Sequence, residues 1–221
     1  GTTSKTRTSV RDKVKVNGQK GAYSNFLTVA ENWLKKQGTK AWDLETTGLD
    51  LVSDKGVTFG FGDYGNQKSY FLDAGKKSET IKNILSAIND KADESAKQLR
   101  KQLGFSTDTN KKISKSEVES VWGEIKKQLI TPVDAAKMMM EAIDNGGLVG
   151  WNSEGYDLRI LENNFSQYLG NVSEAKRAAA EKVIAEFRIK SAKQRDAMLK
   201  SSETMVSRSD FGNVKKGDSL I

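Results

Sequence analysis

The chain has 221 residues, 36% of them hydrophobic and 29% charged, a composition typical of a globular protein. It contains no cysteine and no histidine, which excludes disulfides, thiolate or imidazole metal sites, and catalytic triads that use histidine. Its net charge of +7 favours a nucleic acid partner, although a lysine-rich solvated surface accounts for this charge equally well.

The first predicted segment is a basic arm over residues 1–20. It carries six basic residues against one acid, and it has no helical period. Phe26, Ala30 and Leu34 then fall at helical spacing, and Gly38 follows as a stop signal. We therefore expect a mobile arm, followed by one domain over residues 21–221 that opens with a helix.

Residues 40–45, KAWDLE, predict a strand that runs into a Thr-Thr-Gly turn. Two further strands, GVTFGFGD and KSYFLD, are separated by YGNQ, which is typical of a β-hairpin. Val57, Phe59 and Phe61 alternate onto one face of the hairpin, whereas Gly60 and Gly62 leave the other face open.

A helical block is predicted over residues 77–145. One amphipathic stripe contains Ile81, Ile84 and Ile88, and a second follows from residue 118 to residue 129. The polar stretch between them, residues 90–115, is expected to be an insertion or a solvated extension. A third helix is predicted to begin at Pro132. We expect Thr131 to be its N-cap.

The last predicted core strand covers residues 148–152, LVGWN, and a helix follows it. Residues 172–200 predict one long, charge-rich helix, and the remaining residues are loop-like. Strands, helices and a further strand in this order predict an α/β fold, in which a mixed sheet is flanked by helices and carries a helical insertion.

The segment DLETTGLD carries the first candidate chemistry. Side chains alternate along a strand, so Asp43 and Glu45 project from the same face, about 7 Å apart along the strand. Two carboxylates in this position repel each other unless a cation lies between them, and oxygen ligands favour Mg²⁺ or Mn²⁺. The other interpretation, which the pattern alone leaves open, is an edge strand with two solvated acids.

The segment GWNSEGYDLRIL carries the second set of candidate functional residues. A buried strand ends at Asn152, and Asp157 falls in the first turn of the next helix, where the helix dipole favours an ionised carboxylate. The end of a strand that leads into a helix is where α/β sheets gather ligands. An ordinary first-turn acid and a capping asparagine would give the same pattern.

Together the two segments resemble motifs I and II of the DEDD (DnaQ-like) 3′–5′ exonucleases, which have an RNase H-like fold. Motif I is Asp-x-Glu followed by Thr-Gly, and motif II is matched by Asn152, Tyr156 and Asp157. The resemblance covers about residues 39–161 and implies two Mg²⁺ or Mn²⁺ ions at a nucleic acid 3′ end. It implies that Asp43, Glu45 and Asp157 are the catalytic metal ligands. It further implies that the nucleotide-binding residues are Thr46, Thr47, Gly48, Leu49, Asn152 and Tyr156.

The third motif of that family, which supplies a fourth carboxylate, is missing. There is no histidine, and no tyrosine has an aspartate four residues later; Asp210 and Asp218 are the late acids that remain as substitutes. We therefore expect a fragment of a longer nuclease that is inactive by itself, with a polymerase proofreading domain as one parent that the resemblance allows. The alternative is a degenerate relative that binds nucleic acid or assembles without catalysis.

The sequence also predicts the cellular location of the chain. No apolar run reaches the roughly 18 residues that a membrane span requires, and the first residues lack the apolar core of a signal peptide. We therefore expect a cytoplasmic protein with no membrane partner. DNA or RNA is the expected partner, together with a polymerase domain or the missing C-terminal part.

Overall fold

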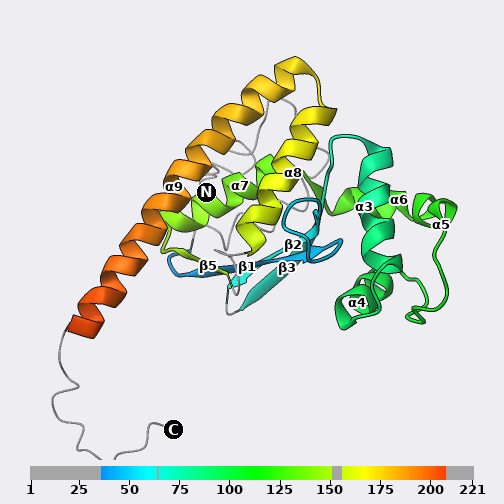
Figure 1. The fold of residues 1–221 in the computed structure, drawn as a ribbon, viewed down its shortest axis with the longest axis horizontal. Coiled ribbons are helices and arrows are strands. Elements are labelled where there is room, and N and C mark those ends of the chain that lie inside the picture. Colours follow the sequence, from blue (N-terminus) through cyan, green and yellow to red (C-terminus); the bar gives the residue numbers. More distant parts are fainter. Residues whose placement is uncertain (1–35, 64, 151–155, 208–221) are drawn as a thin grey trace, which may run out of the picture.

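The computed structural model describes residues 36–63, 65–150 and 156–207, with side chains as far as Gln194. The predicted basic arm and the helix expected after residue 26 lie outside the described residues. Within them the fold is α/β, as predicted: a mixed five-stranded sheet is flanked by helices (Figure 1).

The sheet has the strand order β4-β3-β2-β1-β5. Its centre is the antiparallel set β1 (Lys40–Thr46), β2 (Gly56–Asp63) and β3 (Asn66–Leu72), which confirms the predicted strand and hairpin. The short strand β5 (Leu148–Gly150) pairs parallel to β1, and β4 (Leu129–Ile130) pairs parallel to β3. A strand of two residues has no recognisable period, so β4 was not expected.

Three helices cover one face of the sheet: α7 (Pro132–Asp144), α8 (Leu158–Asn171) and α9 (Glu174–Ser207) (Figure 1). We call this the covered face, and the opposite one the open face. The main core lies under the three helices, where Trp42, Leu44 and Phe59 are buried together with Phe165 and Ile184. The predicted long helix is confirmed as α9.

The N-terminus of α7 is built as predicted. Pro132 occupies the first turn, where its missing N–H is not needed. The hydroxyl of Thr131 accepts from the Asp134 N–H at 3.0 Å, and the Asp134 carboxylate accepts from the Thr131 N–H, which completes a capping box. Both residues are buried, so α7 begins inside the protein and needs these bonds to satisfy its first amides.

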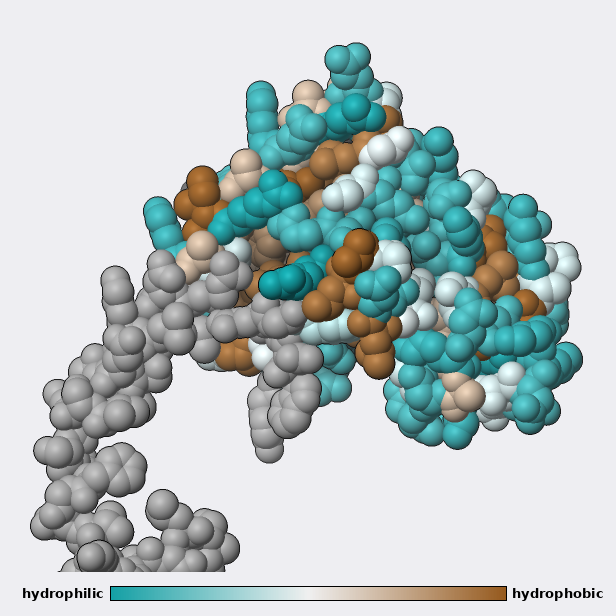
Figure 2. Space-filling model, in the orientation of Figure 1, coloured by the Kyte–Doolittle hydropathy of each residue, from teal (hydrophilic) through white to brown (hydrophobic). Residues whose placement is uncertain are grey.

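The rest of the helical block forms a second unit beside the sheet. Its helices are α3 (Lys77–Asn89), α4 (Glu94–Gln102), α5 (Lys115–Ser120) and α6 (Trp122–Lys127). They bury their own apolar cluster against Val57, Phe71 and Leu129 of the sheet. Since α7 packs in the main core, this second unit contains only α3–α6; we call it the insertion below, although an insertion over about residues 77–145 stays a prediction. Its outer surface is largely hydrophilic (Figure 2).

A buried arginine organises the longest loop of this insertion. Arg100 of α4 is fully buried, and its guanidinium donates to the carbonyl oxygens of Ile88, Asp108 and Lys111 at 2.7–2.9 Å. The three carbonyls come from the end of α3 and from the loop after α4. A buried guanidinium is tolerated only when its donors are paired, so these bonds fix the loop and the position of α4 together.

Candidate active site

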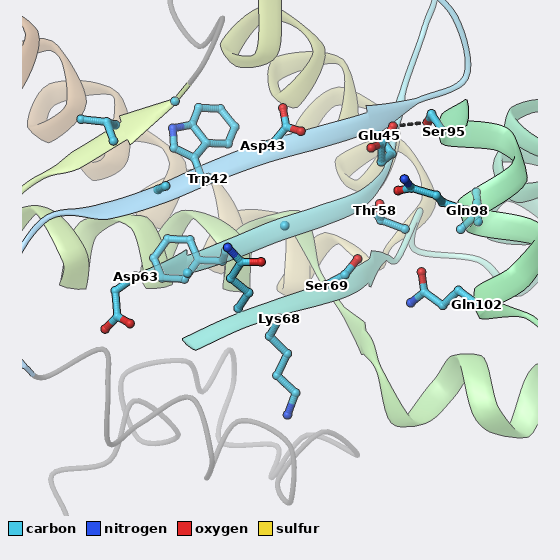
Figure 3. Close-up of a pocket in the computed structure, with 18 residues that line it drawn as sticks. Trp42, Asp43, Glu45, Thr58, Asp63, Lys68, Ser69, Ser95, Gln98 and Gln102 are labelled. Atoms are coloured by element: carbon cyan, nitrogen blue, oxygen red, sulfur yellow. Dashed lines mark hydrogen bonds between the residues drawn. The ribbon is translucent and has the colours of Figure 1, made fainter. Parts of the chain in front are cut away.

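A pocket of about 770 Å³ lies on the open face of the sheet, between the strands and α4. Its floor is formed by β1, β2 and β3, and α4 forms one wall (Figure 3). The lining is mixed in character, with two acids close together on β1 and amide and hydroxyl groups on α4. The main lining side chains are Asp43, Glu45, Thr58, Asp63, Gln67, Lys68, Ser69, Ser95, Gln98 and Gln102.

The floor follows from strand alternation and register. Trp42, Leu44 and Thr46 of β1 are buried on the covered face, so Asp43 and Glu45 project from the open face as predicted. Asp43 lies opposite Gly60 of β2, which in turn lies opposite Ser69 of β3. The row beside Asp43 therefore contains a glycine and a small hydroxyl, which leaves space above the strands.

Gly60 and Gly62 differ in what they do for this floor. A Cβ atom added to Gly60 would approach nothing nearer than the Asp43 carbonyl oxygen, at 3.7 Å. A Cβ added to Gly62 would lie 2.5 Å from the Asn66 carbonyl oxygen, which is a clash. Gly62 is therefore required by the hairpin, whereas no packing contact explains the glycine at position 60.

A β-bulge ends the acidic row. The register between β1 and β2 shifts between Glu45 and Thr46: Glu45 pairs with Thr58 and Thr46 with Gly56. Val57 is therefore skipped in the pairing with β1, and the regular alternation of side chains along β2 is interrupted there. Val57 is buried with the insertion helices, while Phe59 and Phe61 belong to the main core. The prediction that Val57 shares a face with Phe59 and Phe61 is therefore wrong, because the bulge turns it.

The side chain of Glu45 is held by the insertion. The Ser95 hydroxyl of α4 donates to Oε2 of Glu45 (Figure 3). Lys91, just before α4, donates from Nζ to the Thr46 carbonyl oxygen at 3.0 Å. These residues were missed because residues 90–115 are polar overall. The spacing of Ala96, Leu99 and Leu103, which are all buried, is the signal that could have revealed α4.

Lysine and aspartate side chains add charge at the rim of the pocket. Desolvation lowers the pKa of Lys68, whose side chain extends away from Asp43 (Figure 3). Asp63 lies at the end of β2 and accepts from the Gly65 N–H and the Asn66 amide at 3.0 and 2.9 Å. The hydrogen bond from Asn66 is the largest cause of its lowered pKa. Asp63 thus closes the hairpin turn as well as lining the pocket.

The turn after β1 uses its polar groups internally. The Thr46 hydroxyl is buried and donates to the Gly48 carbonyl oxygen at 2.7 Å, and the Thr47 hydroxyl donates to Asp54 at 2.7 Å. Asp54, which the sequence analysis did not single out, also accepts from the Asp50 N–H at 2.6 Å. These bonds shape the turn. Two apolar side chains remain outside it, since Leu49 and Val52 are 84% and 83% exposed.

The helix of the second predicted motif holds this turn in place. The Tyr156 hydroxyl donates to the Gly48 carbonyl oxygen and lies 3.2 Å from the Thr46 hydroxyl. Further along α8, the Asn163 amide donates to the carbonyl oxygens of Leu51 and Asp54 at 3.0 and 2.9 Å. The two motif segments, far apart in the sequence, therefore lie in direct contact.

Asp157 is placed differently from the two acids of β1. It directly precedes α8 as its N-cap residue, whereas the sequence predicted a position in the first turn, and it is only 3% exposed. It is not among the residues that line the pocket. Of the three expected carboxylates, the structure therefore places Asp43 and Glu45 at one pocket, and the convergence of Asp157 on it stays a prediction. Asn152, Asp210 and Asp218 lie outside the described residues.

The donor set fits a weakly held divalent cation. In the described ranges, no group of three or more Asp and Glu side chains is placed to hold a metal ion. Asp43 and Glu45 nevertheless offer two carboxylates on one face at the edge of a pocket. Mg²⁺ is commonly held by one or two carboxylates together with substrate phosphates, so this pair suffices for a site that a phosphate completes.

Comparisons with known proteins add no relative. No family model matches the chain, and neither a curated protein nor a solved structure matches it. None of the helices that the structure describes is long and apolar enough to cross a membrane.

Proposed function

We propose that the chain forms the metal-binding part of a 3′–5′ exonuclease domain with an RNase H-like sheet. The observation that carries the proposal is the pair Asp43 and Glu45, which project from β1 into the pocket between the sheet and α4. Support also comes from the sheet, in which an antiparallel set of three strands is extended by a parallel strand beside β1. Contact between Tyr156 and the turn after β1 joins the two motif segments.

In this proposal the chain's residues bind and orient the end of a nucleic acid strand. Asp43 and Glu45 hold Mg²⁺ or Mn²⁺ jointly with a phosphate, and Gly60 and Ser69 leave room for that phosphate beside Asp43. The cation, when bound, supplies electrostatic stabilisation of negative charge at the phosphate. Leu49, on the hydrogen-bonded turn after β1, is exposed and available to pack against a base. A third carboxylate ligand from Asp157 stays a prediction.

The alternative function is binding of nucleic acid without catalysis. The lining of the pocket favours it: Asp157 is buried and is not part of that lining, so Asp43 and Glu45 offer two carboxylates where a nuclease needs more. The described lining residues also include no tyrosine that would orient an attacking water. Under this alternative the pocket binds a strand and the cation is dispensable.

A binding and cleavage assay separates the two functions. A fluorescent single strand with a 3′-hydroxyl is titrated with the full chain, with and without Mn²⁺, and the products are then resolved by length. We expect Mn²⁺ to strengthen binding of the strand by the wild type and not by Asp43→Asn. Asp157→Asn is tested beside them. If it loses the effect of Mn²⁺ on binding as Asp43→Asn does, Asp157 is also a ligand of the cation. An affinity for the strand that changes neither with Mn²⁺ nor with the Asp43 substitution would support the alternative.

A further inference from the structure

One helix of the insertion faces the proposed metal site across the pocket. Ser95, Gln98 and Gln102 of α4 recur at helical spacing, line the pocket and point toward the sheet (Figure 3). The adjoining side of the same helix carries Ala96 and Leu99, which are buried, and Leu99 also lines the pocket. Thus the polar face of α4 borders the pocket: Gln98 and Gln102 are exposed at its wall, and Ser95 is partly buried.

Of these polar groups, Ser95 touches a proposed ligand directly. Its hydroxyl donates to Oε2 of Glu45, and no described residue donates to Oε1. Figure 3 shows Ser95 on the side of Glu45 that faces away from Asp43. The hydrogen bond therefore occupies the oxygen on the insertion side. The other oxygen is left for a ligand shared with Asp43.

The chain just before α4 is built to hold this position. Asp93 caps α4 by accepting from the Ala96 N–H at 2.9 Å, and its other oxygen lies 3.5 Å from Nζ of Lys91. Lys91 is only 17% exposed and donates to the Thr46 carbonyl oxygen at 3.0 Å. Two successive residues of β1, Glu45 and Thr46, are thus fixed from the insertion. Arg100 anchors the other end of α4.

We propose that Ser95 is a positioning residue that fixes the Glu45 carboxylate for the divalent cation, and that the helical insertion is therefore part of the active site. The inference rests on the proposed function, because it concerns the same cation. A glutamate has three rotatable side-chain bonds, and it loses freedom when it binds an ion. Ser95 restricts those bonds before the ion arrives, in the way that outer hydrogen bonds orient metal-ligating carboxylates in general.

A purely structural role for Ser95 makes different predictions. If the hydrogen bond served only to attach α4 to β1, its loss would lower the stability of the fold and leave cation affinity unchanged. Lys91 provides the comparison, because it makes the other attachment and touches no carboxylate of β1. A substitution at Lys91 therefore measures what loosening the attachment does by itself.

The test is Mn²⁺ titration of the full chain by calorimetry, with melting temperatures measured on the same samples. We expect Ser95→Ala to weaken Mn²⁺ binding by about tenfold, within the range for lost outer-shell partners. Ser95→Thr keeps the hydroxyl and should restore most of the affinity. Lys91→Met should lower the melting temperature with at most a minor change in affinity, and Ser120→Ala on the exposed surface of α5 should change neither.

Each outcome bears on a different statement. Wild-type affinity in Ser95→Ala, with binding still abolished by Asp43→Asn, would overturn the role of Ser95 and leave the proposed function standing. An equal loss in Ser95→Ala and Lys91→Met would also overturn it, since attachment alone would then explain the effect. If the wild type shows no Asp43-dependent binding, both the proposed function and the role of Ser95 fail.

Discussion

The two faces of the central sheet are made by the same strands but meet different requirements. On the covered face, Trp42, Leu44 and Phe59 are at most 6% exposed and pack beneath α7, α8 and α9. On the open face, their sequence neighbours Asp43 and Glu45 border a pocket. Packing explains every residue of the first set and none of the second. The residues that packing leaves unexplained are therefore where we place function.

Removing a ring from the covered face should have the largest effect. Phe59 is fully buried, and its ring centroid lies 5.4–6.4 Å from those of Trp42, Phe61 and Tyr70. Phe59→Ala should lower the free energy of unfolding by about 3–5 kcal/mol, because it leaves a cavity among rigid neighbours. Urea denaturation measures this. A loss below about 1 kcal/mol would mean that the covered face is not the core.

Acids on the covered side should make stability depend on pH. Burial raises the pKa of the Asp134 carboxyl from its ordinary 3.8 to about 6, although hydrogen bonds with Thr131 oppose the shift. The folded state then holds this proton more tightly than the unfolded chain does. The corresponding stability is complete below about pH 4 and is lost as the pH rises through about 6, a change on the order of 2–3 kcal/mol.

Asp134→Asn isolates that contribution. The amide oxygen still accepts from the Thr131 N–H, but the group no longer titrates. Urea denaturation between pH 4 and pH 8 should show a smaller decline in stability for this variant than for the wild type. Asp90→Asn, at the exposed end of α3, is the control and should follow the wild type. Parallel curves for wild type and Asp134→Asn would contradict the assignment.

The two glycines of β2 should respond in opposite ways. Gly62→Ala should destabilise the protein by about 1–3 kcal/mol, because its Cβ would lie 2.5 Å from the Asn66 carbonyl oxygen. Gly60→Ala should be neutral or stabilising, by up to about 1 kcal/mol, since the space is free and glycine weakens a strand. Thermal denaturation compares them.

A larger side chain at position 60 then tests the floor of the pocket. Gly60→Val should fold, because a Cβ atom at this position would lie 3.7 Å from its nearest neighbour, the Asp43 carbonyl oxygen. The valine side chain would occupy the space beside Asp43, so it should weaken binding of single-stranded nucleic acid. Unchanged binding by a well-folded Gly60→Val protein would show that ligands do not enter there.

The sequence predicted the covered face better than the open one, for a physical reason. Alternating apolar residues and the pair Thr131 and Pro132 are local signals, and they predicted β1, the hairpin and the start of α7 correctly. The bulge after Glu45 is a pairing event between strands, so no local pattern announced that Val57 would leave the main core.

The candidate site was predicted only in part. Strand alternation is enough to put Asp43 and Glu45 on one face. The contact of Ser95 with Glu45 joins residues 50 positions apart and depends on how the insertion docks, which a linear pattern does not contain. Likewise, the sequence predicted Asp157 in the first turn of the helix, whereas the structure makes it the N-cap residue of α8, because the residue at which a helix begins depends on more than its local pattern.

The most direct test of the central claim is calorimetric titration of the full chain with Mn²⁺. Asp43→Asn is compared with Asp63→Asn, whose side chain lies at the far end of the same pocket and keeps its hydrogen-bond acceptor (Figure 3). We expect weak binding by the wild type, no detectable binding by Asp43→Asn, and near wild-type binding by Asp63→Asn. Equal binding by wild type and Asp43→Asn, or none by either, would contradict the claim that Asp43 and Glu45 hold a divalent cation.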